Sequence, residues 1–145
     1  MTVSTIILAA GKGTRMKSPI PKVLHKIAGK YLLSFSVQLS KDIKSKETIV
    51  VVGKETELVT RKAVSDHKIK FCVQKNQHGT GDAVKIALKN LKTKTKHTLV
   101  LYGDTPFITK KTIKRMISRA EKGFEFVFLG FQSEAKNSYG KFNLG

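Results

Sequence analysis

The sequence predicts an α/β domain with a doubly wound, mostly parallel sheet and helices on both of its faces. Three observations support this prediction. Short apolar or β-branched runs alternate along the chain with longer segments of helical periodicity. The connections between these segments are short, as in β–α–β units. The first apolar run is followed at once by a glycine-containing loop, and in open parallel sheets such a loop lies where ligands bind.

The first half of the chain supplies five of the predicted elements. Val3–Ala9 is predicted as a buried strand because it is an apolar run without charge. Tyr31–Ile43 is predicted as a helix, although the spacing of its apolar residues is imperfect. Thr48–Val52 is rich in β-branched residues and is predicted as the second strand. Glu55–His67 places its apolar residues on one helical face. Ile69–Val73 is predicted as the third strand.

The second half supplies four more elements. Thr80–Leu91 repeats apolar residues at intervals of three and four, which predicts an amphipathic helix, and Asp82 in its first turn suits the helix dipole. Thr98–Tyr102 is predicted as the fourth strand. Thr109–Lys122 is predicted as a helix that stops before a glycine. Phe124–Phe131 is rich in aromatic residues and is predicted as a fifth strand.

The charge of the chain is strongly positive. Its 145 residues include 28 Lys and Arg but 10 Asp and Glu, which gives a formal net charge of +18. Such a charge raises the question of nucleic acid. The lysines are spread along the whole chain, however, without an arginine-rich block or interleaved aromatic residues, so we do not expect nucleic acid as a partner. The charge would suit a ligand with several phosphates.

Cysteine content and hydropathy bear on the compartment. Cys72 is the only cysteine, which excludes a disulfide framework and favours a cytoplasmic protein. It lies in an apolar run and is interpreted as a small core residue. The first residues do not have the pattern of a secretory signal. No apolar stretch approaches the roughly 20 residues that cross a bilayer, so no membrane association is expected.

The loop after the first strand has the composition of an anion site. It reads Leu-Ala-Ala-Gly-Lys-Gly-Thr-Arg-Met over 8–16 and continues to Pro21 and Lys22. Its two glycines allow the backbone to approach a ligand, and successive N–H groups can surround an anion. Arg15 and Lys22 add full charges that can bind phosphate. The spacing excludes a P-loop, and Met16 stands where a dinucleotide fingerprint needs its third glycine. A phosphate-bearing ligand is predicted; the alternative is a lysine-rich surface loop.

Two stretches at later strand ends add polar groups. Gln74 and Gln77 offer amides that could hydrogen-bond the edge of a base, and Gly79 and Thr80 come before a helix N-terminus. The alternative for this stretch is an ordinary β–α turn. Asp104 follows the fourth predicted strand and could bind Mg²⁺ as a hard oxygen ligand. The alternative is that Asp104 only bonds the turn backbone. A third stretch, 138–142, is weak by itself and could be a simple turn.

Taken together, these stretches resemble the sugar-nucleotidyltransferase superfamily, and within it the bacterial N-acetylglucosamine-1-phosphate uridylyltransferase family. The resemblance is carried by 8–16, 21–25 with 28–30, Gln74 with 79–81, 102–104 and 139–141. It implies a Rossmann-like, GT-A-like nucleotidyltransferase architecture. It also implies that residues 1–145 correspond to the N-terminal portion of such a domain, without the acetyltransferase β-helix of the family.

The resemblance also implies roles for individual residues. The catalytic residues are expected to be Arg15 and Lys22, which would contact phosphates, and Asp104 is expected to bind Mg²⁺. Leu8–Gly11 and Gln74 would hold uracil and ribose, Gly79 and Thr80 would line the base pocket, and Gly140 would lie near the amino sugar. The full set of other expected substrate-binding positions is Leu8, Ala9, Ala10, Gly11, Gln74, Gly79, Thr80, Tyr102, Gly103 and Gly140.

The implied reaction joins UTP and N-acetylglucosamine 1-phosphate to give UDP-N-acetylglucosamine, a bacterial cell-envelope precursor, and pyrophosphate. Three alternatives stay open. The chain could be a nucleotide-binding module without catalysis. It could be one subunit of a split enzyme, which needs a partner chain or assembles as a homo-oligomer. It could also be a nucleotidyltransferase for another sugar 1-phosphate or a polyol. The family usually has His, Pro and Arg where this chain has Asp82, Tyr31 and Lys141.

Overall fold

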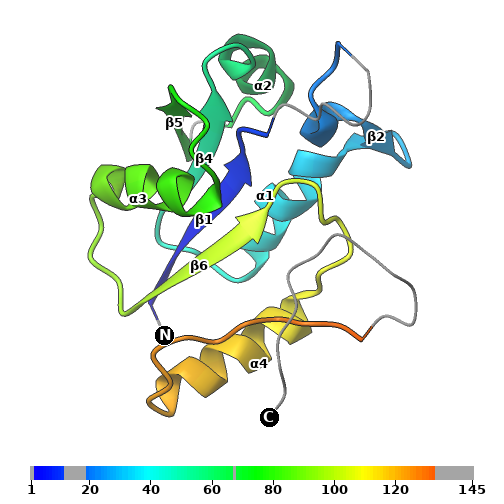
Figure 1. Cartoon of the computed structure of the whole chain (residues 1–145). Helices are drawn as coiled ribbons and strands as arrows, with labels where there is room; N and C mark the ends of the chain where they lie inside the picture. Colours follow the sequence, from blue (N-terminus) through cyan, green and yellow to red (C-terminus); the bar gives the residue numbers. More distant parts are fainter. Residues whose placement is uncertain (1, 12–18, 67, 133–145) are drawn as a thin grey trace.

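A four-stranded parallel sheet forms the centre of the molecule in a computed structural model, which describes residues 2–11, 19–66 and 68–132 (Figure 1). The strand order is β5-β4-β1-β6. The strands are β1 (Val3–Ala9), β4 (Thr48–Gly53), β5 (Ile69–Gln74) and β6 (His97–Tyr102). All described residues of β1 and β4 are buried, as expected for central strands covered on both faces. The parallel order brings the carboxyl ends of all four strands to one edge.

Helices cover both faces of this sheet, as the sequence predicts. The helices are α1 (Leu32–Asp42), α2 (Glu57–Ala63), α3 (Thr80–Asn90) and α4 (Lys110–Glu121). One core cluster joins α1 and α4 to the odd-numbered side chains of β1. The other joins α3 to the even-numbered ones. The second face is covered less completely, because α3 contacts β1, β4 and β5 but leaves Val100 and Tyr102 of β6 exposed.

A small hairpin, not predicted from the sequence, follows the β1 loop. The short 3-10 helix η2 (Lys22–Leu24) leads into β2 (Lys26–Ile27) and β3 (Lys30–Tyr31), which pair antiparallel. Ala28 and Gly29 form the turn between them, both with positive φ (50° and 75°). Two residues with positive φ are typical of the tight hairpin turns that match strand twist. The hairpin and η2 place Lys22 beside the end of β6.

The prediction of a strand over Phe124–Phe131 is wrong. This segment, orange in Figure 1, is irregular backbone after α4 and takes no part in the sheet. Its phenylalanines are exposed, and the rings of Phe126 and Phe128 stack with centroids 6.3 Å apart. Aromatic composition favours a strand only where a neighbouring strand supplies the ladder. Within the part of the chain that the structure describes, β6 pairs with β1 alone.

The other predicted elements are confirmed with small changes at their ends. The largest change is in α2, which begins at Glu57 and ends at Ala63, so it is shorter than the predicted 55–67. Thr109 is the N-cap of α4, and its Oγ1 accepts a hydrogen bond from the Thr112 N–H at 3.2 Å. Such a cap satisfies one of the N–H groups that a helix start leaves open.

Candidate functional site

A pocket of about 330 Å³ opens at the carboxyl ends of the strands. Its walls come from the ends of β1, β5 and β6, the start of α3, and η2. The residues that line it are Leu8, Ala9, Ala10, Gly11, Lys22, Val23, Gln74, Gln77, Gly79, Thr80, Ala83, Tyr102 and Asp104. Open parallel sheets bind ligands at this edge. A larger surface hollow lies on α4, but six residues of that helix alone form it, without any strand end.

The backbone at the end of β1 is held by two neighbouring loops. The Gln77 side chain donates from Nε2 to the Ala10 carbonyl at 2.6 Å. The Gly103 N–H donates to the Leu8 carbonyl at 2.9 Å. The buried Ala10 is thereby fixed at the base of the pocket, and the exposed Gly11 lies at its rim.

Gly103 does not line the pocket, although the resemblance predicts it as a substrate-binding position. It lies behind the wall, where a Cβ would come within 3.0 Å of Val23 Cγ1, 3.1 Å of the Leu8 carbonyl oxygen and 3.2 Å of Leu33 Cδ1. Its missing side chain therefore lets β6, β1 and α1 approach one another. This packing supports the position of Asp104, the next residue.

Gln74 ends β5 with its side chain almost wholly buried, and its amide nitrogen has two acceptors. Nε2 donates to the Gly79 carbonyl at 3.1 Å and to Asp82 Oδ2 at 2.8 Å. Gly79 has φ +91° at the N-cap of α3, a conformation that side chains rarely adopt. Asp82 was not among the predicted site residues. Its contact with Gln74 depends on how α3 packs against β5, for which the sequence carries no signal.

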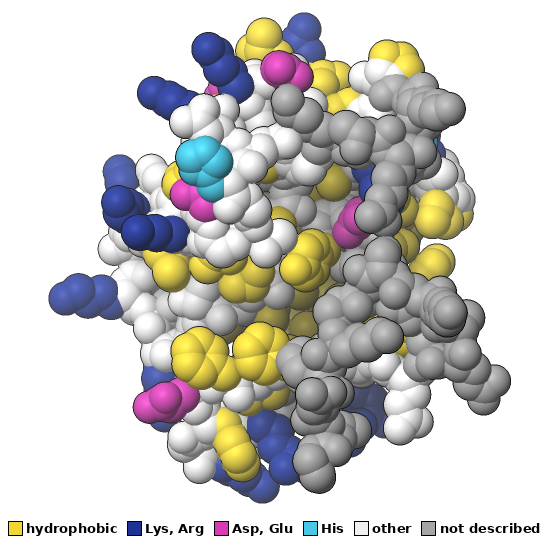
Figure 2. All heavy atoms as spheres, in the orientation of Figure 1, with side chains coloured by type: hydrophobic (Ala, Val, Ile, Leu, Met, Phe, Trp, Pro, Cys, Tyr) yellow, Lys and Arg dark blue, Asp and Glu magenta, His cyan; other side chains and the backbone are white. Residues whose placement is uncertain are grey.

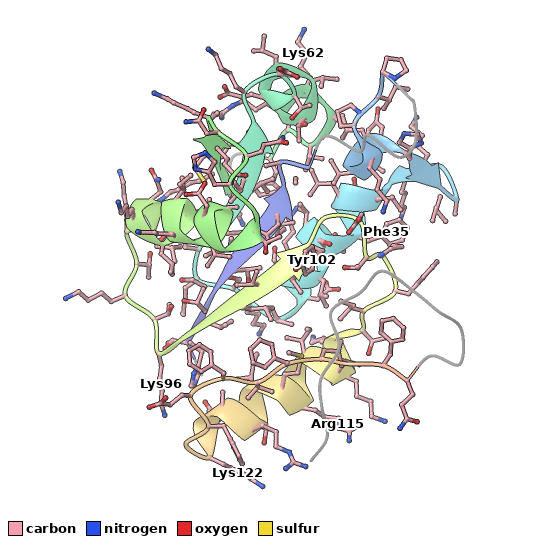
Figure 3. The ribbon with its side chains drawn as sticks, in the orientation of Figure 1. Phe35, Lys62, Lys96, Tyr102, Arg115 and Lys122 are labelled. Atoms are coloured by element: carbon pink, nitrogen blue, oxygen red, sulfur yellow. The ribbon has the colours of Figure 1, made fainter. Side chains whose placement is uncertain are left out.

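Asp104 and Lys22 form an ion pair across the mouth of the pocket. Lys22 Nζ lies 2.9 Å from Asp104 Oδ2, with the two side chains 47% and 29% exposed. The turn before Asp104 is fixed because Ser36 and Thr105 both donate from their hydroxyls to the Tyr102 carbonyl, at 2.9 and 3.0 Å. Figure 3 shows Tyr102 at the carboxyl end of β6, beside this turn.

The donor set at Asp104 fits a magnesium ion that arrives with phosphates. No group of three or more metal-ligating acidic, His or Cys side chains occurs among the described residues. Mg²⁺ commonly takes one or two protein carboxylates and completes its octahedron with phosphate oxygens and water. Asp104 is a partly exposed carboxylate whose partner Lys22 can turn away. A single-carboxylate site is therefore chemically adequate for a metal–nucleotide.

Arg15 and Gly140 lie outside the described residues, as do Tyr139 and Lys141. Their expected roles in binding phosphate and the amino sugar thus stay predictions from the sequence. The remaining predicted site residues other than Gly103 all line the one pocket.

Among the described residues, two groups have a shifted pKa, and both lie outside this pocket. Burial raises the pKa of the Cys72 thiol to about 11, which keeps it protonated and unreactive in the core. Burial would also raise the pKa of Glu47, but hydrogen bonds from Lys70 and from the 92–93 backbone outweigh it and hold the pKa at about 2. Glu47 comes just before β4, so this carboxylate serves the opposite edge of the sheet.

The fold and pocket define the chain as an α/β protein of the nucleotidyltransferase type, with ligand groups at the ends of parallel strands. The chain belongs to the MobA-like NTP transferase domain family, whose model matches residues 5–139.

Curated relatives give the same result. The chain is 42% identical over 142 residues to bifunctional protein GlmU of Parvibaculum lavamentivorans, and 41% identical over 142 residues to that of Alkaliphilus metalliredigens. These alignments cover 96% and 97% of this chain but only 31% and 30% of the relatives. The chain therefore spans about a third of the length of the curated relatives it matches.

Solved structures share the fold. Rv0371c of Mycobacterium tuberculosis matches with a TM-score of 0.72 at 19% identity, over 83% of this chain and 61% of that one. HddC of Yersinia pseudotuberculosis, solved with GMP-PN, matches with a TM-score of 0.65 at 28% identity, over 83% and 54%. The same Rv0371c protein has also been solved in complex with manganese.

None of the helices in 2–11, 19–66 and 68–132 is long and apolar enough to cross a membrane.

Proposed function

We propose that the chain carries the uridine triphosphate site of an N-acetylglucosamine-1-phosphate uridylyltransferase. In this proposal, residues 1–145 are the N-terminal portion of a sugar-nucleotidyltransferase domain. The supporting observation is the pocket itself, which combines a β1 loop, a buried glutamine amide and a carboxylate–lysine pair at one edge of a parallel sheet. The identity to the GlmU proteins supports the choice of nucleotide and sugar.

Different parts of the pocket would hold different parts of UTP. Gln74 and the backbone at Gly79 and Thr80 would contact uracil, and the Leu8–Gly11 backbone would contact uracil and ribose. The triphosphate would extend toward Lys22, whose ammonium group stands at the mouth beside Asp104. Mg²⁺ bound by Asp104 would neutralise phosphate charge when the nucleotide is present.

Catalysis at this site would consist of positioning and charge neutralisation. The phosphate of N-acetylglucosamine 1-phosphate is already ionised, so its oxygen can attack the α-phosphorus of UTP without a strong general base. The bond from the α-phosphorus to the bridging oxygen breaks, and pyrophosphate leaves. Lys22, together with Arg15, would stabilise the charge that develops on the phosphates. The sugar phosphate would enter near Gly140.

One alternative has a specific observation in its favour. HddC, at 28% identity, was solved with a guanine nucleotide analogue, so a related chain accepts a purine in this fold. A nucleotidyltransferase for another sugar 1-phosphate therefore stays a candidate, as does a module that binds nucleotide and needs a second chain for turnover.

Calorimetry with the purified chain tests the proposal directly. We expect UTP to bind in the presence of Mg²⁺ more tightly than ATP, and to raise the thermal stability by mass action. A coupled assay for pyrophosphate release with N-acetylglucosamine 1-phosphate then measures turnover. We expect it to be far slower than that of a full-length enzyme, because the chain spans about a third of its relatives. Equal or tighter binding of ATP would contradict the uridine assignment.

A further inference from the structure

The hydrogen bonds of the Gln74 side chain determine which way its amide faces. Gln74 is 3% exposed at the end of β5, and both acceptors of its Nε2 lie at the start of α3. One acceptor is the Gly79 carbonyl oxygen and the other is the Asp82 carboxylate. A glutamine amide has two N–H groups, so both of its donors are used by these two contacts.

The reverse orientation of this amide is disfavoured by the same two groups. A carbonyl oxygen and an ionised carboxylate can only accept hydrogen bonds. Turning the amide over would place Gln74 Oε1 against the Gly79 carbonyl oxygen and the Asp82 carboxylate. None of these oxygens carries a hydrogen that could form a hydrogen bond between them. Buried polar atoms without a partner are costly, and more so beside a charge. The assignment of nitrogen and oxygen therefore follows from the chemistry of the neighbours rather than from the shape of the amide.

The oxygen of Gln74 is consequently the group that this side chain offers to the pocket. Among the residues that the structure describes, Oε1 receives no hydrogen bond, and Gln74 is part of the pocket wall. An acceptor at this place discriminates between bases. Uracil and thymine carry an N–H at ring position 3 and guanine carries one at position 1, whereas cytosine N3 and adenine N1 are acceptors.

We propose that Asp82 is a positioning residue that holds Gln74 as a hydrogen-bond acceptor and thereby selects nucleotides whose base carries a ring N–H. The inference rests on the proposed function, because it assumes that a nucleotide occupies the pocket. Asp82 would not touch the base itself. It would act through the amide of Gln74. The nucleotides that bind poorly would be those whose base places an acceptor nitrogen against the acceptor oxygen of Gln74.

The ratio of UTP to CTP binding measures this effect. UTP and CTP are the same size and differ at ring positions 3 and 4, so the ratio isolates the polarity of the contact. We expect the unmodified chain to bind UTP at least about 10-fold more tightly than CTP, because a mismatched acceptor pair leaves two buried polar groups unpaired. In Asp82→Asn, the new side chain can present either oxygen or nitrogen to Gln74. The ratio should then fall by about 3-fold or more, with CTP binding improved.

A matched control exists elsewhere in the chain. Gln38 Nε2 donates to Asp42 Oδ1 at 2.8 Å on α1, so Asp42→Asn changes the same kind of glutamine–aspartate contact away from the pocket. This variant should leave the UTP to CTP ratio unchanged. The side-chain amide of Gln74 gives an independent readout by NMR. Its two hydrogens should exchange slowly with solvent in the unmodified chain and faster in Asp82→Asn.

The outcomes separate this inference from the proposed function. If the unmodified chain binds UTP tightly and Asp82→Asn keeps its full preference over CTP while folded, the role of Asp82 is refuted and the uridine site stands. Equal losses of UTP and CTP in Asp82→Asn would likewise refute it, since that result indicates a structural role only. If the unmodified chain binds neither UTP nor CTP, the proposed function fails and the inference fails with it.

Discussion

Lys22 holds the one carboxylate that we propose as a metal ligand. In the ion pair at 2.9 Å, its ammonium group lies against Asp104 Oδ2, an oxygen that a divalent cation could use as a ligand. A lysine is a flexible point charge, so it can leave the carboxylate when a metal arrives and turn to a phosphate instead. Lys22 would thus compete with free Mg²⁺ for Asp104 but strengthen the binding of the nucleotide. Substitution of Lys22 should therefore change the affinities for Mg²⁺ and for UTP in opposite directions.

Lys22→Ala should weaken UTP binding and strengthen the binding of Mg²⁺ alone. The loss of a charge-assisted contact to phosphate is worth about 1.5–3 kcal/mol, less where solvent screens it. Uridine, which has no phosphate, should bind as before. Calorimetry with Mg²⁺, uridine and Mg²⁺–UTP gives the three affinities. Equal losses for uridine and UTP would show that Lys22 acts through folding instead.

Asp104→Asn should abolish the Mg²⁺ dependence of UTP binding and leave metal-free uridine binding nearly intact. The amide retains the shape of the carboxylate but loses the charge that a hard cation requires. Titrations of UTP with and without Mg²⁺ measure the difference. Asp42→Asn, which removes the charge of a carboxylate on α1 away from the pocket, is the control and should keep the metal dependence. A metal effect that survives in Asp104→Asn would exclude Asp104 as the ligand.

The elements of the sheet are joined at their amino ends by Glu47. This residue is 6% exposed just before β4, and it accepts hydrogen bonds from the backbone N–H groups of Lys92 and Thr93 at 3.0 and 2.7 Å. It also pairs with Lys70 of β5. One carboxylate thus joins β4, β5 and the connection between α3 and β6, at the edge opposite the pocket.

Glu47 should make the fold sensitive to acid. Its pKa is lowered from 4.5 to about 2 in the folded chain, so its stabilising contribution is complete above pH 4.5 and is lost as pH falls toward 2. Glu47→Gln should reduce the free energy of unfolding by roughly 3 kcal/mol at pH 7 and by much less near pH 2. Urea unfolding across this range measures it. A difference that does not depend on pH would contradict the electrostatic account.

The sequence could predict most of the elements but not all of their contacts. Periodicity and β-branching define β1, β4, β5, β6 and the four helices within a few residues. The strand over Phe124–Phe131 fails because a strand depends on a partner as well as on its own composition. Lys22, Gln74 and Asp104 could be placed at one sheet edge, since parallel strands end together. The contacts of Gln74 with Asp82 and of Lys22 with Asp104 depend on packing between distant segments.

For the whole molecule, the two faces of the sheet are covered unequally. The sequence predicts helices on both faces, and the structure confirms this. Among the described residues, however, α3 packs mainly over β1, β4 and β5 and leaves Val100 and Tyr102 of β6 exposed. Figure 2 shows hydrophobic side chains over the lower part of one face, with Lys and Arg mostly around its outline. Apolar groups and cationic charge are therefore the two features that a neighbouring molecule would meet.

Among the described residues, β6 has one edge without a strand partner, and the phenylalanines after α4 are exposed, so colloidal stability should depend on charge. With a net charge of +18, copies of the chain repel one another over a Debye length of about 10 Å at 0.1 M salt, which shrinks to about 3 Å at 1 M. Apolar surface and an open strand edge then promote aggregation. Light scattering should therefore rise with sodium chloride. It should rise less for Phe126→Ser, which removes one of the two stacked rings after α4, than for Phe107→Ser, a residue of nearly equal exposure in the β6–α4 connection. Scattering that stays constant up to 1 M salt would show that something other than charge repulsion keeps copies of the chain apart.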